Sequence, residues 1–111
     1  MKKKSDYVMC IIASPSECSE TIAEAIVSRK LAACAQVFPG VASFYWWNGE
    51  LRKDSETLIY LKTKESAVPG IERLLPSIHP YEVPELIVLP VTGGLDSYLG
   101  WIDRTVTGSD R

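Results

Sequence analysis

Residues 77–85 hold the densest group of reactive side chains in this sequence. The stretch reads Ser-Ile-His-Pro-Tyr-Glu-Val-Pro-Glu and contains the single histidine, His79, beside Tyr81, Glu82 and Glu85. An imidazole held rigidly near a phenol and carboxylates can serve as a metal ligand, a general base or a donor in a ligand pocket. The plainer alternative is a histidine that caps the C-terminus of a helix, with Tyr81 packed on the core. The residue types alone leave both interpretations open.

Two prolines fix the backbone around this histidine. Pro80 biases His79 away from helical φ and ψ, and Pro84 does the same to the residue before it. An amphipathic helix over residues 69–78 must therefore end here, and the chain must leave it extended. The sequence predicts that His79 lies at a junction between a helix and a strand.

Hydrophobic patterning predicts the remaining elements. The apolar run 7–13 is typical of a strand covered on both faces. Ser14-Pro15 followed by Glu17 has the form of a capping box and predicts a helix that runs to about Leu31. Asn48-Gly49 favours a type I′ hairpin turn. The other expected elements are a strand over 33–47 with a bulge or kink at Pro39-Gly40, a return strand over 50–64, a strand over 85–91 and a short helix over 95–102.

This order predicts an α+β fold in a single domain, 1–111, with an ordered core of about 6–106. The pattern βαββαβ is that of a ferredoxin-like antiparallel sheet with two helices on one face, here with an extended hairpin and a short C-terminal helix. The second face of such a sheet needs a cover, and the aromatic segment 44–47 is too apolar to be comfortably solvated. We therefore expect self-association.

Composition and charge argue against several classes of protein. The net charge of −2 gives no general attraction to nucleic acid, and the basic and aromatic signature of an RNA-recognition module is absent from the sequence. Cys10, Cys18 and Cys34 cannot all pair and show no C-x-x-C spacing, which argues against a disulfide framework or a closed zinc site. No apolar stretch approaches the roughly 20 residues that span a bilayer. We expect a cytoplasmic protein with neither a membrane nor a nucleic-acid partner.

Five segments carry a family resemblance that covers nearly the whole chain, from about Val8 to Ile102. They are Leu31-Ala32-Ala33-Cys34-Ala35, Tyr45-Trp46-Trp47-Asn48-Gly49-Glu50, Leu61-Lys62-Thr63-Lys64, His79-Pro80-Tyr81-Glu82-Val83-Pro84-Glu85 and Leu89-Pro90-Val91. In this order and spacing they closely resemble the CutA divalent-ion tolerance family. The resemblance implies a ferredoxin-like homotrimer, related in architecture to the PII signal proteins and associated with tolerance to copper and other divalent ions. It implies no enzymatic reaction.

The resemblance also implies a copper site, which this sequence keeps only in part. Family members with a described site use a cysteine near the end of the first strand and two adjacent histidines before the Pro-Tyr pair. The corresponding positions here hold Ile12, Ile78 and His79, so one ligand of three remains. Cys10 lies on the same strand face as Ile12 but about 7 Å further along. We expect His79 to be the metal ligand and Cu(II), or another divalent cation, to bind weakly.

The leading hypothesis is a trimeric divalent-cation tolerance protein of the CutA type. It would bind copper, another divalent ion or a small ligand near a subunit boundary, beside His79. Trp46 and Trp47 point to opposite faces of one strand, so at most one of them can line a given pocket. We expect Trp47, Tyr81 and Glu85 to be the ligand-contacting residues.

Two alternatives remain open from the sequence. The first is a non-catalytic trimeric scaffold, or a PII-like signalling protein without a metal role. The second is an enzyme with His79 as general base beside Glu82, but the sequence has no recognisable nucleophile motif or phosphate-binding loop. We therefore assign no catalytic residue. Asp54 and Glu56 are expected to be solvated charges.

Overall fold

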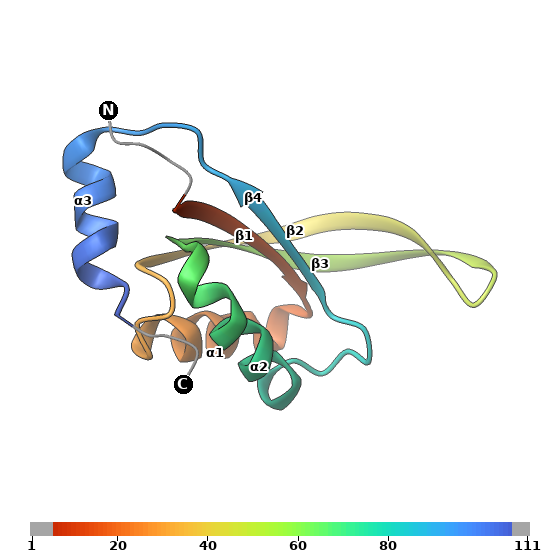
Figure 1. Cartoon of the computed structure of the whole chain (residues 1–111). Coiled ribbons are helices and arrows are strands. Elements are labelled where there is room, and N and C mark those ends of the chain that lie inside the picture. Colours follow the sequence, from red (N-terminus) through yellow and green to blue (C-terminus); the bar gives the residue numbers. More distant parts are fainter. Residues whose placement is uncertain (1–5, 108–111) are drawn as a thin grey trace.

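The computed structural model describes residues 6–107, which fold around one four-stranded sheet (Figure 1). The elements follow the predicted order, with a short 3₁₀ turn added before the second helix. They are β1 (Tyr7–Ser14), α1 (Ser16–Ser28), β2 (Cys34–Trp47), β3 (Glu50–Lys64), the turn η1 (Glu65–Ala67), α2 (Val68–Ile78), β4 (Glu85–Pro90) and α3 (Asp96–Thr105). Within residues 6–107, no helix is long and apolar enough to cross a bilayer.

The sheet is antiparallel throughout, and its strand order is β2-β3-β1-β4. The first strand, β1, pairs with β3 on one side and with β4 on the other. Helices α1 and α2 both lie on one face of the sheet (Figure 1). This is the ferredoxin-like βαββαβ arrangement that the sequence predicts.

The hydrophobic core lies between the sheet and these two helices. Cys10 and Ile12 of β1 are fully buried and pair with Leu61 and Ile59 of β3. The helices contribute Ile22, Ile26, Ile71 and Leu75. The side-chain alternation along β1 therefore directs Cys10 and Ile12 to the same, helix-covered face, as expected.

The opposite face of the sheet carries an apolar surface. Ile11 pairs with Tyr60 and Ile87 across the sheet, and the ring of Phe38 lies 4.6 Å from that of Tyr60. Phe38 and Ile87 are 43% and 47% exposed, and Leu89 on β4 is also exposed. Among the described residues, no helix covers this face (Figure 1). An apolar face of this kind is typical of a surface that meets another protein chain.

The strands β2 and β3 continue beyond the helices as a long hairpin (Figure 1). Asn48 and Gly49 have φ angles of 51° and 76°, and positive values at both positions are what a type I′ turn requires. The pairing shifts register between Phe38 and Val41, where Gly40 has a φ of 75°. This shift confirms the bulge that the Pro-Gly pair predicts.

Helix α1 begins differently from the expectation. Ser14 is the last residue of β1, and the N-cap position belongs to Pro15, whose side chain makes no capping hydrogen bond. The Ser14 hydroxyl donates instead to the carbonyl of Pro15 at 3.1 Å. The predicted capping box is therefore wrong, because the strand continues to the residue that was expected to cap the helix.

The same helix ends at Ser28, three residues before the expected end. Lys30 adopts a left-handed conformation with a φ of 59°. Its N–H donates to the Val27 carbonyl, and the N–H of Leu31 donates to the Ile26 carbonyl at 3.1 Å. These two bonds form a Schellman motif, which ends a helix most often at a glycine. Because a lysine occupies the left-handed position, no glycine in the sequence indicates where the helix ends.

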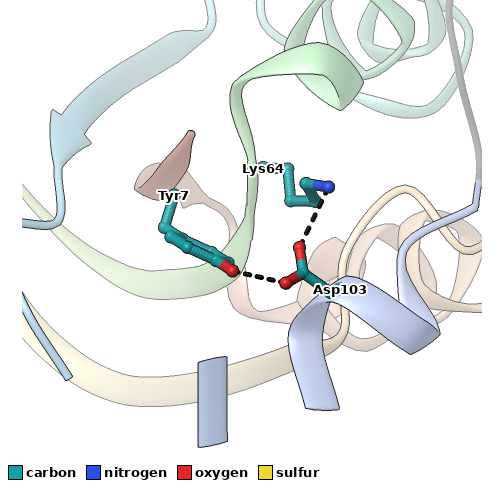
Figure 2. A network of polar contacts seen from close by, with 3 residues as sticks. All are labelled: Tyr7, Lys64 and Asp103. Carbon is teal, nitrogen blue, oxygen red and sulfur yellow. Dashed lines mark hydrogen bonds and ion pairs between the residues drawn. The ribbon is translucent and has the colours of Figure 1, made fainter. Parts of the chain in front are cut away.

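Helix α3 packs at the end of the sheet that lies opposite the hairpin tip (Figure 1). Its Leu99 and Ile102 are buried in the core. The hydroxyl of Tyr7 donates to Asp103 of α3 at 2.5 Å, and the ammonium of Lys64 lies 3.0 Å from the same carboxylate (Figure 2). This network joins the start of β1, the end of β3 and the last helix.

Candidate functional site

His79 directly follows helix α2, whose last residue is Ile78. Its N–H donates to the carbonyl of Leu75 at 2.8 Å, and its backbone is extended, with φ of −110° and ψ of 132°. The proline that follows His79 favours this conformation. The structure thus places His79 at the predicted junction between a helix and the chain that leads to a strand.

The imidazole of His79 is buried, and backbone groups engage both of its nitrogens. Nε2 lies 2.7 Å from the carbonyl oxygen of Ala13, and Nδ1 accepts the N–H of Tyr81 at 3.2 Å. A carbonyl only accepts and an amide N–H only donates, so this pattern requires the neutral tautomer with its proton on Nε2. His79 therefore ties the end of β1 to the connection between α2 and β4.

This arrangement limits what His79 can offer to a metal ion. Neither ring nitrogen has a free lone pair, so a metal would have to displace the contact with Ala13 or Tyr81. Ile12 is fully buried in the core, and Ile78 packs partly buried against it. Within residues 6–107, no three His, Cys, Asp or Glu side chains are grouped so that they could hold a metal.

Cys10, the alternative thiol ligand, is also poorly suited to metal binding. Its side chain is fully buried on the helix-covered face of β1. Desolvation raises the pKa of the Cys10 thiol to about 11. Since the thiolate is the form that binds metals, the protonated thiol favoured here is a weak ligand.

Tyr81 connects the histidine to a carboxylate on the hairpin. Its ring centroid lies 4.8 Å from that of His79, and its hydroxyl donates to Oε2 of Glu56 at 2.8 Å. Glu56 is 8% exposed, so the expectation of a solvated charge is wrong for this residue. Burial of the phenol, followed by its hydrogen bond to Glu56, raises the pKa of Tyr81 above its ordinary value. The phenol therefore remains a hydrogen-bond donor.

A groove of about 510 Å³ opens beside Tyr81, between the base of the hairpin and the α2–β4 connection. Its aromatic lining residues are Phe44, Tyr45, Trp47 and Tyr81, and its charged ones are Arg52, Glu56, Glu82 and Glu85. Trp47, Tyr81 and Glu85, which the sequence analysis assigns to one binding site, all line this groove. The imidazole of His79 is not part of the lining, but it holds two lining residues in place through its hydrogen bonds to Ala13 and Tyr81.

The charges in the groove are not balanced. Desolvation, followed by repulsion from Glu56, raises the pKa of Glu85 above its ordinary value. Within residues 6–107, the side-chain carboxylate of Glu85 makes neither a hydrogen bond nor an ion pair. Arg52 is the one cationic side chain in the described lining, and it forms no ion pair with Glu56 or Glu85. The groove therefore combines aromatic walls with a surplus of negative charge.

Several lining residues were missed from the sequence, and some of them had a signal. The turn at Asn48-Gly49 sets a register in which Trp47 pairs with Glu50 and Tyr45 with Arg52. Because side chains alternate along a strand, these residues share one face of the hairpin. Tyr45 and Arg52 could have been inferred in this way. The hydrogen bond between Tyr81 and Glu56 has no such signal, because it joins residues 25 positions apart through the tertiary fold.

Trp46 and Trp101 lie away from this groove. Trp46 is 71% exposed and does not line the groove, which agrees with the prediction that at most one of Trp46 and Trp47 lines a given pocket. Trp101 packs against Tyr98 with a ring distance of 5.5 Å and lines a second, more open groove beside Cys34. Among the described residues that line this second groove, no side-chain hydrogen bond or ion pair brings polar groups together, so the first groove is the better candidate for a binding site.

Comparisons with known proteins agree with this fold. The profile of the CutA1 divalent ion tolerance protein family matches residues 7–105. The curated divalent-cation tolerance protein CutA of Thermus thermophilus is 40% identical over 103 residues, which cover 93% of this chain and 99% of that protein. The chloroplastic CutA 1 of rice, Oryza sativa subsp. japonica, is 37% identical over 102 residues, which cover 92% of this chain. The chain spans only 58% of the length of that rice relative.

Solved structures of CutA proteins are also similar to this chain. The crystal structure of CutA1 from Oryza sativa superposes with a TM-score of 0.91 at 35% identity, over 97% of this chain and 100% of the other. A structure described as the PII-like protein CutA from Nostoc sp. PCC 7120, in apo form, superposes with a TM-score of 0.85 at 26% identity. The latter match covers 91% of this chain and 98% of the Nostoc chain.

Proposed function

The chain is a member of the CutA1 divalent ion tolerance family, and we propose that it acts as a homotrimeric, non-catalytic binding protein. Its ligand, a divalent ion or a small molecule, would occupy the groove near Trp47, Tyr81 and Glu85, close to a subunit boundary. The curated relative from Thermus thermophilus carries the name divalent-cation tolerance protein, which supports a role in the response to metal ions.

One observation carries the proposal of a binding site. Trp47 from β2, Tyr81 from the α2–β4 connection and Glu85 from β4 converge on a single groove. Buried Glu56 contributes a carboxylate to the same groove, and Tyr81 donates to it. Aromatic walls with a few converging polar groups are typical of a small-molecule site.

The apolar face of the sheet supports the homotrimer. Phe38, Ile87 and Leu89 expose large side chains there, and the hairpin extends well beyond the rest of the sheet (Figure 1). Additional copies of the chain would cover both features. We expect light scattering at micromolar concentration to give the mass of three chains, and a monomer would contradict this part of the proposal.

Copper, if it is the ion, should bind weakly. His79 would have to give up one of its two backbone contacts to coordinate the ion. We expect Cu(II) titrations to show weaker binding in His79→Ala than in the wild type, and stronger binding in Ile78→His, which adds a second imidazole. Unchanged copper affinity in His79→Ala would mean that the metal binds elsewhere.

The second candidate is a PII-like signalling protein without a metal role. The similarity to the Nostoc structure, whose description uses the term PII-like, favours it. This alternative predicts binding of a small molecule with no response to divalent ions. Both candidates have the same binding groove and differ in its ligand.

Calorimetric titration of the full chain with Cu(II), Zn(II) and adenine nucleotides tests the proposal. We expect at least one of these ligands to bind, and Trp47→Ala to weaken its binding. Trp46→Ala is the matched control, because this residue points to the other face of the same strand and does not line the groove. Equal losses in the two variants would contradict a site in the groove.

We also propose a cytoplasmic location. Cys10, Cys18 and Cys34 are free cysteines, and free thiols are typical of a reducing compartment. The native protein should give the mass of three reduced cysteines under non-reducing, denaturing conditions. A deficit of about two daltons per chain, the mass of the two hydrogens lost in a disulfide, would contradict this.

A further inference from the structure

The lining of the groove contains a buried carboxylate whose hydrogen-bonding capacity is only partly used. Glu56 is 8% exposed, and Tyr81 is its one hydrogen-bond donor within residues 6–107. An ionised carboxylate has two oxygens and about four acceptor sites, so one hydrogen bond leaves most of them unused. Buried charges are normally paired with an opposite charge. Glu56 therefore has capacity for a cationic partner.

A second carboxylate lies close enough to interact with the first. Glu85 lines the same groove as Glu56, and desolvation, followed by repulsion from Glu56, raises the pKa of Glu85. No described residue pairs with Glu85, and Arg52 forms no ion pair with either acid. A positive charge between Glu56 and Glu85 would relieve both the desolvation and the repulsion. Within residues 6–107, no cationic side chain lies paired between these two acids.

The rest of the lining indicates what kind of cation fits. The rings of Trp47, Tyr45 and Tyr81 line the same groove, and aromatic faces attract organic cations through cation–π interactions. A bare metal ion would need a tighter set of ligands, and no three His, Cys, Asp or Glu side chains in the described part of the chain provide one. The groove volume of about 510 Å³ falls within the range of small-molecule sites.

We propose that the groove binds an organic cation, a small molecule with an ammonium or quaternary ammonium group. The charged group lies against Glu56 and Glu85, and its carbon substituents pack on Trp47 and Tyr81. The inference rests on the proposed function, because it names the ligand class for the same groove. Arg52 lines the hairpin side of the same groove, where it can pair with a polar or anionic group elsewhere on the ligand.

Choline and its neutral isostere 3,3-dimethyl-1-butanol are suitable probes, because they have almost the same shape and differ in charge. We would titrate each into the full chain at pH 7.5 and constant ionic strength, and measure the heat of binding. We expect choline to bind about tenfold more tightly than the isostere, since only choline gains the carboxylate and cation–π interactions. Equal affinities would overturn the inference.

Matched variants locate the binding. Glu85→Gln and Trp47→Ala should each weaken choline binding about tenfold. Glu72→Gln, which makes the same charge change on an exposed face of α2, and Trp46→Ala should leave it unchanged. Melting temperature and light scattering show whether each variant is folded and assembled as the wild type is. Choline binding that neither groove variant weakens would overturn the inference.

The outcomes separate this inference from the proposed function. If choline fails to bind but Cu(II), Zn(II) or a nucleotide binds in a manner that depends on Trp47, the ligand class is wrong and the groove remains the site. If a cationic side chain of a second copy already occupies the groove, choline will also fail to bind, which overturns the inference. If no probe binds in a Trp47-dependent manner, both proposals fail.

Discussion

Two tyrosine hydroxyls donate to carboxylates at opposite ends of β1, and the two sites differ in how the carboxylate charge is balanced. At the start of the strand, Tyr7 donates to Asp103 at 2.5 Å, and Lys64 lies 3.0 Å from the same carboxylate (Figure 2). Near the other end, Tyr81 donates to Glu56 at 2.8 Å, with no cation paired to that acid within residues 6–107.

The difference separates a structural contact from a site that can bind a ligand. The Asp103 network is complete, because a donor and a cation satisfy its charge, and it fixes α3 to the sheet. The Glu56 network leaves carboxylate oxygens unused beside a groove that also contains Glu85. The same hydrogen-bond chemistry therefore serves a structural role at Asp103 and, in our proposal, a binding role at Glu56, to which no described residue supplies a counter-charge. Four experiments can test this comparison.

Removing the imidazole of His79 should have the largest effect. His79→Ala leaves the Ala13 carbonyl and the Tyr81 N–H without their partner and creates a cavity behind the groove. We expect the free energy of unfolding to fall by about 3 kcal/mol. Urea unfolding at fixed protein concentration measures it, with Glu72→Ala on the exposed face of α2 as the control. A loss below about 1 kcal/mol would show that the ring does not hold the groove together.

Removing each tyrosine hydroxyl tests the comparison directly. Tyr81→Phe leaves buried Glu56 without a donor and should destabilise the fold by about 1–3 kcal/mol. Tyr7→Phe should have a smaller effect, because Lys64 still pairs with Asp103. Urea unfolding of the two variants side by side gives the difference. Equal losses would mean that the charge balance of the two carboxylates does not distinguish the sites.

The stability that the Tyr7–Asp103 hydrogen bond provides at the start of β1 should decrease at alkaline pH. The hydrogen bond to Asp103, followed by desolvation and the charge of that carboxylate, raises the pKa of Tyr7 from 10.0 to about 12. The stabilisation is therefore fully present below pH 10 and is lost as the pH rises through about 12. Thermal melts over this range should show a smaller decline in Tyr7→Phe than in the wild type. Parallel declines would argue against the Tyr7 contribution.

Titration of Glu85 should change the stability of the fold at acidic pH. This should be the smallest of the four effects, because Glu85 is exposed. Its raised pKa means that the folded state favours the protonated acid, so stability is lost as the pH rises through the folded pKa. Glu85→Gln should therefore melt slightly higher than the wild type at pH 7. This gain should disappear below the ordinary pKa of 4.5. A variant that is less stable at pH 7 would indicate an unrecognised partner for Glu85.

Local sequence patterns were sufficient to predict most of the architecture. The prolines after His79, the Asn48-Gly49 turn and the bulge at Gly40 act through local backbone preferences, so they could be interpreted without a structure. The apolar patterns predicted the sheet and its helices because burial on one face imposes a period on each element. The position of Tyr81 and Glu85 beside His79, the alternation of side chains at Trp47 and the family resemblance led to a predicted site of three residues that all line one groove in the structure.

The contacts that connect these residues depend on how distant segments pack in the folded chain. His79 meets Ala13 across 66 positions and Tyr81 meets Glu56 across 25, and no local preference encodes contacts of that range. The burial of Glu56 and the engagement of both imidazole nitrogens follow from how the α2–β4 connection packs on the end of β1. A polar residue in a strand pattern is expected to face solvent, because ionised groups are costly to bury. Whether such a residue is instead enclosed depends on segments distant in the sequence, which only the folded chain brings together.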